Sequence, residues 1–188
     1  MIKEKKTSSA IIYLQSGLFL DILNPKPEQI NIFDIAKGLA NKGHFAGQTP
    51  KFFSIAEHSI MVARLSGNLE GLLHDAAEAY LSDIVTPLKT ALPDYKIIEM
   101  RLMDIIADKF KLNKDYLHSK ELKQHDIQIL AYEYYKFFKG NINPFTYKER
   151  IDFDQLEEML NGNKLQYLYP HEAYNKFMRM YYKYKKHE

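Results

Sequence analysis

One histidine and two acidic residues lie close together in a stretch of the chain that is otherwise rich in leucine and alanine. The stretch reads Leu72-Leu73-His74-Asp75-Ala76-Ala77-Glu78-Ala79-Tyr80. Its small and apolar residues favour burial, and burying one polar group without a partner costs roughly 2 to 7 kcal/mol. Three such groups therefore predict a compensating ion, charge or hydrogen-bond network. A divalent metal would satisfy all three at once.

The same stretch has helical character, and Asn68 is placed to cap its beginning. On such a helix Glu78 lies one turn beyond both His74 and Asp75, at offsets of four and three. The sequence therefore predicts that the three head groups share one side of a helix that starts after Asn68.

His58 lies on the apolar side of a predicted helix that begins at Ser54 and ends at Gly67. Ser54 and Glu57 have the spacing of a capping box. Apolar residues follow His58 at offsets of three, four and seven, so its side chain is expected to face inward. A single inward-facing histidine is more often a core residue than a metal ligand. His58 is therefore predicted as a ligand only together with the other candidate ligands.

Asp126 interrupts an apolar stripe in the predicted helix over 119–138. Alone, such a carboxylate indicates a buried salt bridge or a helix cap. Together with His58, His74 and Asp75 it is better explained as a fourth metal ligand. The chain has no cysteine, so the ligands must be nitrogen and oxygen atoms. Two imidazoles and two carboxylates suit Mn, Co, Zn, Fe or Mg better than calcium, which prefers oxygen ligands only.

The order His58, His74-Asp75, Asp126 resembles the H…HD…D pattern of the HD-domain metal-dependent phosphohydrolases. The flanking sequences resemble the 5′-deoxynucleotidase-like branch, and they are also similar to small phage and bacterial proteins that hydrolyse deoxynucleoside triphosphates. The segments that carry the likeness are Ile32–Ala36, His44–Thr49, Phe53–Ser59, His74–Ile84 and Pro87–Lys89. The resemblance implies an all-α helical bundle with the four metal ligands on separate helices.

The resemblance also implies roles for residues near the metal ligands. Glu78 would orient or deprotonate the attacking water, and Asp83 matches a position associated with catalysis. Lys89 matches a position that supplies positive charge for a phosphate. Relatives have an arginine followed by an aromatic residue where this chain has His44-Phe45. We expect these two residues to contact phosphate and base, without the bidentate grip of a guanidinium group.

Helical periodicity dominates the chain and predicts one all-α domain over 1–188. The exception is 11–23, where β-favouring residues flank Ser16-Gly17 and predict a small N-terminal β-hairpin. The remaining expectations are a disordered segment over 1–9, a metal-binding helical core over 31–138 that opens with Asn31 as a helix cap, and C-terminal helices over 150–188.

Composition limits the partners of the protein. The 188 residues are 46% apolar, enough for one domain with a core and a pocket. A net charge of +2 falls short of the basic balance of a dedicated polynucleotide binder. No apolar run approaches the ~20 residues of a spanning helix, so we expect no membrane insertion and a cytoplasmic location. The 25 phenylalanine and tyrosine residues could also supply an interface, and a homo-oligomer, a dimer or larger, is expected.

These observations predict a metal-dependent phosphohydrolase that acts on small deoxynucleotides. Cleavage of a 5′-monophosphate to the nucleoside is the first expectation, and hydrolysis of a triphosphate such as dATP to tripolyphosphate is the alternative. The guanosine-alarmone hydrolases of the same superfamily carry a further acidic residue directly after the catalytic glutamate, where this chain has Ala79. A non-catalytic nucleotide sensor that retains the metal for structure is a third possibility.

Overall fold

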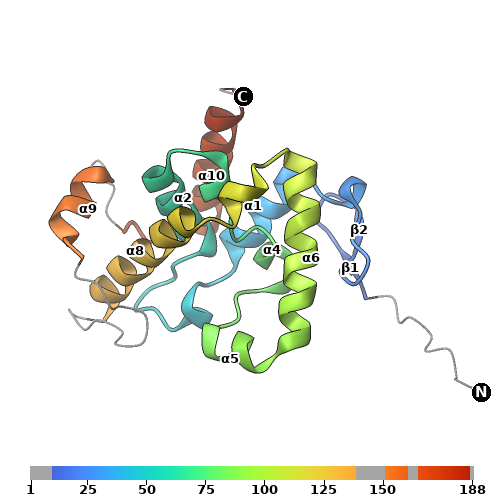
Figure 1. The fold of residues 1–188 in the computed structure, drawn as a ribbon, viewed down its shortest axis with the longest axis horizontal. Helices are drawn as coiled ribbons and strands as arrows, with labels where there is room; N and C mark the ends of the chain where they lie inside the picture. Colours follow the sequence, from blue (N-terminus) through green and yellow to red (C-terminus); the bar gives the residue numbers. More distant parts are fainter. Residues whose placement is uncertain (1–9, 139–150, 161–164, 187–188) are drawn as a thin grey trace, which may run out of the picture.

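The structure, a computed structural model, describes residues 10–138, 151–160 and 165–186. Within these ranges the chain is an all-α bundle with a two-stranded hairpin near the N-terminus, which confirms the predicted fold class (Figure 1). The expectation of disorder over 1–9 lies outside the described residues. Among the described helices, none has an apolar stretch long enough to cross a membrane. The elements in chain order are β1 (Ile11–Tyr13), β2 (Phe19–Asp21), η1 (Pro27–Gln29), α1 (Ile32–Asn41), η2 (Phe45–Gly47), α2 (Ile55–Ser66), α3 (Leu69–Leu73), α4 (Glu78–Leu81), α5 (Thr86–Ala91), α6 (Pro93–Phe110), α7 (Lys114–Leu117), α8 (Lys120–Phe137), α9 (Phe153–Met159) and α10 (Pro170–Lys185).

The hairpin pairs β1 with β2 in antiparallel register, with Ile12 opposite Leu20. Its turn includes Gly17 at φ +86°, a backbone conformation that residues with a side chain rarely adopt. Ser16 ties this turn to α1, because its amide and its hydroxyl donate hydrogen bonds of 3.0 and 2.5 Å to the carboxylate of Asp34. The hairpin is therefore attached to the helical bundle by side-chain contacts as well as by the buried Leu20.

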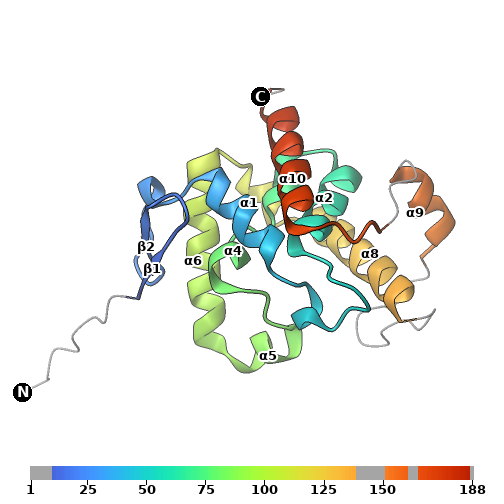
Figure 2. The ribbon, with the colours of Figure 1, turned by 180° about the vertical axis from the view of Figure 1, so that it is seen from behind.

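Helix α2 is the central helix of the bundle, and nine consecutive residues of it, from Ile55 to Ala63, are buried. A helix that is buried all round must have packing partners on every side. One side packs into a core shared with α1, α3, α6 and α10, and the other side packs with Phe53, α8 and α9. Seen from behind, α10 crosses in front of α1 and α2 (Figure 2). His58 lies on α2 between the two cores and is fully buried.

Helix α1 carries the short helix α4 on its surface. The approach is close because position 38 is a glycine: a Cβ atom there would lie 2.5 Å from the carbonyl oxygen of Ala79. Lys42, just after α1, donates hydrogen bonds of 2.8 and 2.7 Å from its Nζ to the carbonyl oxygens of Glu78 and Ala79. These contacts fix the backbone of α4, whose first residue is Glu78.

The predicted helix caps are confirmed. The side chain of Asn31 accepts a hydrogen bond from the amide of Asp34, and Asn68 caps α3 in the same way. Ser54 and Glu57 form the capping box of α2, and Gly67, in the left-handed conformation, caps the end of this helix.

The single helix predicted to start after Asn68 is wrong. It stops at Leu73, residues 74–77 form turns, and α4 begins afresh at Glu78. In the turns the amides of Ala76 and Glu78 bond to carbonyl oxygens three residues back instead of four. The tertiary contacts that hold α4 against α1 override the local helical preference, which is a weak determinant by itself.

Candidate metal centre and its cavity

Four side chains from three separate parts of the fold meet at one point. His58 comes from α2, His74 and Asp75 come from the turn between α3 and α4, and Asp126 comes from α8. The Nε2 atom of His74 lies 3.1 Å from Asp75 Oδ2 and 3.8 Å from Asp126 Oδ1. The Nε2 atom of His58 lies 3.2 Å from Asp126 Oδ1 and 3.7 Å from Asp75 Oδ2. The structure thus brings together all four of the predicted ligands.

The spacing of these atoms fits a metal ion. Ligand atoms about 2.1 Å from a common ion lie about 3.0 to 3.4 Å apart at octahedral or tetrahedral angles. Of the four histidine–carboxylate separations, 3.1 and 3.2 Å fall in this range, whereas 3.7 and 3.8 Å exceed it. One ligand atom each of His58, His74 and Asp75 all lie within 4.8 Å of one another, and a second such group, His44, His58 and Glu133, shares His58. The Nδ1 atom of His74 is 2.9 Å from the carbonyl oxygen of Gly71, which directs Nε2 into the cluster. That Nε2 is buried and makes no well-aligned hydrogen bond among the described residues, although it lies within ion-pair distance of Asp75 and Asp126. The donor set could therefore hold a divalent cation.

The electrostatics of the cluster show how strongly these groups interact. Burial opposes a charge on His58, but Glu133 and Asp126 outweigh it and raise the pKa of His58 to about 9. Burial likewise opposes ionisation of Asp126, yet His58 and His74 hold its pKa well below the usual value. Metal ligands must be deprotonated, so a cation binding here would displace protons from the imidazoles.

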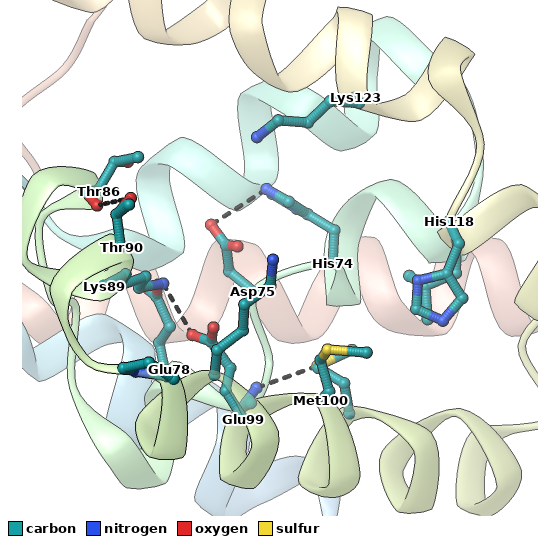
Figure 3. Close-up of a pocket in the computed structure, with 15 residues that line it drawn as sticks. His74, Asp75, Glu78, Thr86, Lys89, Thr90, Glu99, Met100, His118 and Lys123 are labelled. Atoms are coloured by element: carbon teal, nitrogen blue, oxygen red, sulfur yellow. Dashed lines mark hydrogen bonds and ion pairs between the residues drawn. The ribbon is translucent and has the colours of Figure 1, made fainter.

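A cavity of about 560 Å³ opens beside the cluster, and His74, Asp75 and Glu78 all line it (Figure 3). The three head groups therefore face one space although the helix predicted to carry them is interrupted. Other residues that line this cavity include Thr86, Lys89, Pro93, Lys96, Glu99, Met100, Met103, Leu117, His118 and Lys123. Of the arginines that the structure describes, none lines it.

Glu78 is buried at the edge of this cavity, with 5% of its surface exposed. Its Oε1 accepts a 2.7 Å hydrogen bond from Nζ of Lys89, which donates an equally short bond to Glu99 (Figure 3). Burial and the charge of Asp75 raise the pKa of Glu78 to about 8 against the opposing effect of Lys89. Lys89 thus lines the cavity as expected of a phosphate contact, but two carboxylates already engage its amino group.

Lys123 is a residue of the cavity that sequence reasoning missed. It extends from α8 toward His74 and Asp75 (Figure 3), and its Nζ lies 2.6 Å from Oδ2 of Asp126. The signal was present in the sequence, because a lysine three positions before a predicted ligand on the same helix shares its face.

The predicted substrate residues His44 and Phe45 do not line the cavity. His44 is buried, with its Nδ1 3.1 Å from Asp83 Oδ2 and its Nε2 3.5 Å from Glu133 Oε2. Burial opposes a charge on His44, but these two carboxylates outweigh it and raise its pKa to about 10. Phe45 packs among aromatic rings of α8, with its ring centroid 5.8 Å from that of Phe137.

Asp83, the second predicted catalytic residue, points at His44 and does not line the cavity. It follows Ser82, whose φ of 75° and ψ of 156° lie in a region that is almost restricted to glycine. Phe45 and Ala46, which follow His44, also have positive φ values of 54° and 51°. The backbone is therefore strained on both sides of the His44–Asp83 contact.

Glu133 is the second residue that sequence reasoning missed. It is fully buried on α8, and its two carboxylate oxygens lie 3.0 and 3.1 Å from Nδ1 of His58. It follows Asp126 by seven positions, which is two helical turns, so the inward face that carries Asp126 also carries Glu133. Following the inward face of this helix two turns beyond Asp126 would have identified Glu133 from the sequence.

Two curated bacterial proteins are similar to this chain. The uncharacterized protein YfdR of Escherichia coli (strain K12) is 39% identical over 109 residues, which cover 56% of this chain and 60% of that protein. The uncharacterized protein RCAP_rcc00048 of Rhodobacter capsulatus is 39% identical over 110 residues, which cover 52% of this chain and 56% of that protein. The chain thus spans less than two thirds of the length of these relatives. No protein-family profile matches it.

Proposed function

We propose that the protein is a metal-dependent phosphohydrolase that removes phosphate from deoxynucleoside 5′-monophosphates. The observation that carries the proposal is the convergence of two imidazoles and two carboxylates, of which His74 and Asp75 line a cavity of about 560 Å³ while His58 and Asp126 contact them from the protein interior. A metal buried in the core serves structure, whereas a metal at a cavity wall can meet a substrate.

The residues expected to hold the ion are His58, His74, Asp75 and Asp126. When bound there, a divalent cation supplies charge neutralisation for a phosphoryl group and acidifies water. Glu78 lines the same cavity within one turn of Asp75 and is not needed as a ligand. Its carboxylate can therefore accept the proton of the attacking water or hold a proton for the leaving oxygen.

Three lysines of the cavity would help to bind an anionic substrate once a bound cation offsets the carboxylates of Asp75, Glu78 and Glu99, which line the same cavity. Lys89, Lys96 and Lys123 line it, and Lys123 lies next to the ligand Asp126. Lysines act as single point charges, whereas a chain of phosphates is usually gripped by the planar fork of arginine. Because no described arginine lines the cavity, the site favours one phosphate over three.

The rest of the cavity suits the nucleoside part of such a substrate. Pro93, Met100, Met103 and Leu117 form an apolar section of its wall. Its volume falls within the 300 to 1,000 Å³ that is typical of small-ligand sites. Methionine adapts to flat ring systems through its flexible, polarizable side chain, so these residues can pack against a base.

The decisive experiment is product analysis on purified protein loaded with Mn²⁺ or Co²⁺. Deoxynucleoside mono- and triphosphates and a guanosine alarmone are supplied separately, and phosphate, tripolyphosphate and pyrophosphate are resolved. We expect phosphate from monophosphates, and loss of turnover with retained metal in Glu78→Gln. Asp108→Asn, which changes an exposed carboxylate paired with Lys114, is the matched control and should behave as wild type.

Each other product identifies a different function. Tripolyphosphate would show the triphosphate hydrolase, and pyrophosphate the alarmone hydrolase. Metal and nucleotide binding without any turnover would make the protein a sensor. Absence of turnover, metal binding and nucleotide binding together would refute the proposal.

A further inference from the structure

Behind the metal centre, a line of ionisable side chains continues from the proposed ligand His58 through residues that the proposed reaction does not use. It runs from His58 through the buried Glu133 and His44 to the partly buried Asp83. The contacts are 3.0 Å between His58 Nδ1 and Glu133 Oε1, 3.5 Å between Glu133 Oε2 and His44 Nε2, and 3.1 Å between His44 Nδ1 and Asp83 Oδ2.

We infer that Glu133 is a positioning residue: it accepts the Nδ1 proton of His58, so that the Nε2 lone pair of His58 is presented to the metal, and His44 anchors Glu133 from behind. The inference rests on the proposed metal centre, and it extends that centre by one layer. Glu133 would not touch metal or substrate.

The geometry of His58 supports this role. One ring nitrogen faces the ligand cluster, with Nε2 3.2 Å from Asp126, and the other faces Glu133. An imidazole has one lone pair when neutral, so the group at Nδ1 decides which nitrogen can bind a cation. A carboxylate, which only accepts, holds the proton on Nδ1 and frees Nε2. Metal-ligating histidines commonly have such a partner, which also raises their basicity.

The burial of Glu133 argues against a role in stability alone. Its side chain has no exposed surface, and taking a carboxylate out of water costs several kcal/mol. Buried ion pairs recover that cost poorly, and apolar side chains of similar volume often serve equally well. A fully buried carboxylate that contacts a metal ligand with both oxygens is better explained by what it does to that ligand.

His44 completes the arrangement from the other side. Its Nε2 is directed to Glu133 and has no well-aligned hydrogen bond among the described residues, while its Nδ1 bonds to Asp83. Its ring lies 4.6 Å from the ring of His58, centroid to centroid. His44 therefore lies between the two carboxylates, at ion-pair distance from Glu133 and hydrogen-bonded to Asp83, and it does not line the cavity.

The test is metal affinity, measured by competition with a chromophoric chelator for Zn²⁺ or Co²⁺. We expect Glu133→Ala to weaken binding by about 10- to 100-fold. Glu133→Gln should weaken it less, because the amide oxygen can still accept the Nδ1 proton. Glu121→Gln, an exposed glutamate at the start of the same helix, is the control and should bind as wild type. Circular dichroism identifies any variant that does not fold.

A second measurement does not depend on the variants. In the Zn²⁺-loaded wild-type protein, long-range ¹H–¹⁵N NMR should find a proton on Nδ1 of His58 and none on Nε2. In His44→Gln we expect kcat to fall while KM stays the same within about threefold, because His44 does not contact substrate.

Several results would overturn the inference. Folded Glu133 variants with wild-type affinity would do so, as would metal bound at Nδ1 of His58. Two ions per wild-type chain, with one lost in Glu133→Gln, would make Glu133 a ligand of a second site. A wild-type protein that binds no metal would remove the metal centre together with this inference. A protein that binds metal but hydrolyses no nucleotide would remove the proposed function alone.

Discussion

Replacing Gly38 by alanine tests how the fold positions Glu78. The added methyl group would lie 2.5 Å from the carbonyl oxygen of Ala79 and 2.9 Å from its Cα, whereas ordinary contact begins at 3.4 Å. The backbone of α4 must therefore retreat by about 0.9 Å or α1 must bend. The oxygen that is pushed also accepts the 2.7 Å hydrogen bond of Lys42.

Two effects of opposite sign determine the free energy of unfolding of Gly38→Ala. Alanine is better than glycine in the interior of a helix by about 1 kcal/mol. Overpacking costs typically 1 to 3 kcal/mol, and weakening the Lys42 bond adds about 1 kcal/mol. The expected net loss is about 1 to 3 kcal/mol. For a chain of this size it corresponds to a fall in Tm of about 2 to 12 °C.

The assay is urea denaturation of Gly38→Ala, with the midpoint and the m-value fitted separately. Lys37→Ala, an exposed change on the same helix, is the control and should stay within about 0.5 kcal/mol of wild type. Adding Ala79→Gly should rescue only part of the loss, because the closest contact is a backbone oxygen. A Gly38→Ala protein that is more stable than wild type, with unchanged turnover, would refute the close approach of α4.

Three further outcomes follow from the site. Free Zn²⁺ or Mn²⁺ at about 100 times its Kd should stabilise the protein by about 2.7 kcal/mol, which raises the Tm by roughly 5 to 11 °C. The Tm shift should vanish in His74→Ala or when a chelator is added. A Tm that does not change with metal would contradict the proposed metal centre. Lys42→Met removes two hydrogen bonds to α4. We therefore expect the free energy of unfolding, measured by urea denaturation, to fall by about 1 to 3 kcal/mol and kcat to fall as well. Unchanged values for both would show that the Lys42 bonds do not hold α4. Lys123→Met should raise KM for a nucleotide about three- to tenfold in steady-state assays, while Lys120→Met leaves it unchanged; equal KM values for the two variants would exclude Lys123 from the substrate site.

The parts of the fold that the sequence predicted are those with local causes. Asn31, Ser54 with Glu57, and Asn68 act within three residues of the helix ends that they cap, so their effect is visible in the sequence. The break between α3 and α4 was missed because its cause is distant. Gly38 and Lys42 contact α4 from more than thirty positions away in the sequence. Residues 74–77 themselves include no glycine or proline that would predict the interruption of the helix.

The candidate site also has a part that could be predicted from local sequence and a part that depends on distant contacts. The inward positions of His58 and Asp126 follow from offsets along single helices, and the structure places both side chains in the cluster. The surroundings of His44 could not be obtained in this way. Whether it meets a substrate or a buried carboxylate depends on how the loop before α2 packs against α8, which involves Glu133, almost ninety positions away.

The backbone at Ser82 has a consequence for how this sequence can change. A serine occupies a conformation that glycine adopts freely, and such a residue costs about 1 to 3 kcal/mol in the folded state. Selection for heat resistance alone should therefore enrich glycine at this position early, wherever the gain exceeds the extra entropy of the unfolded chain. Laboratory evolution that selects for both heat resistance and turnover would show whether Ser82 is replaced by glycine or is retained. Retention would indicate that the backbone conformation at Ser82 is needed to orient the side chain of Asp83.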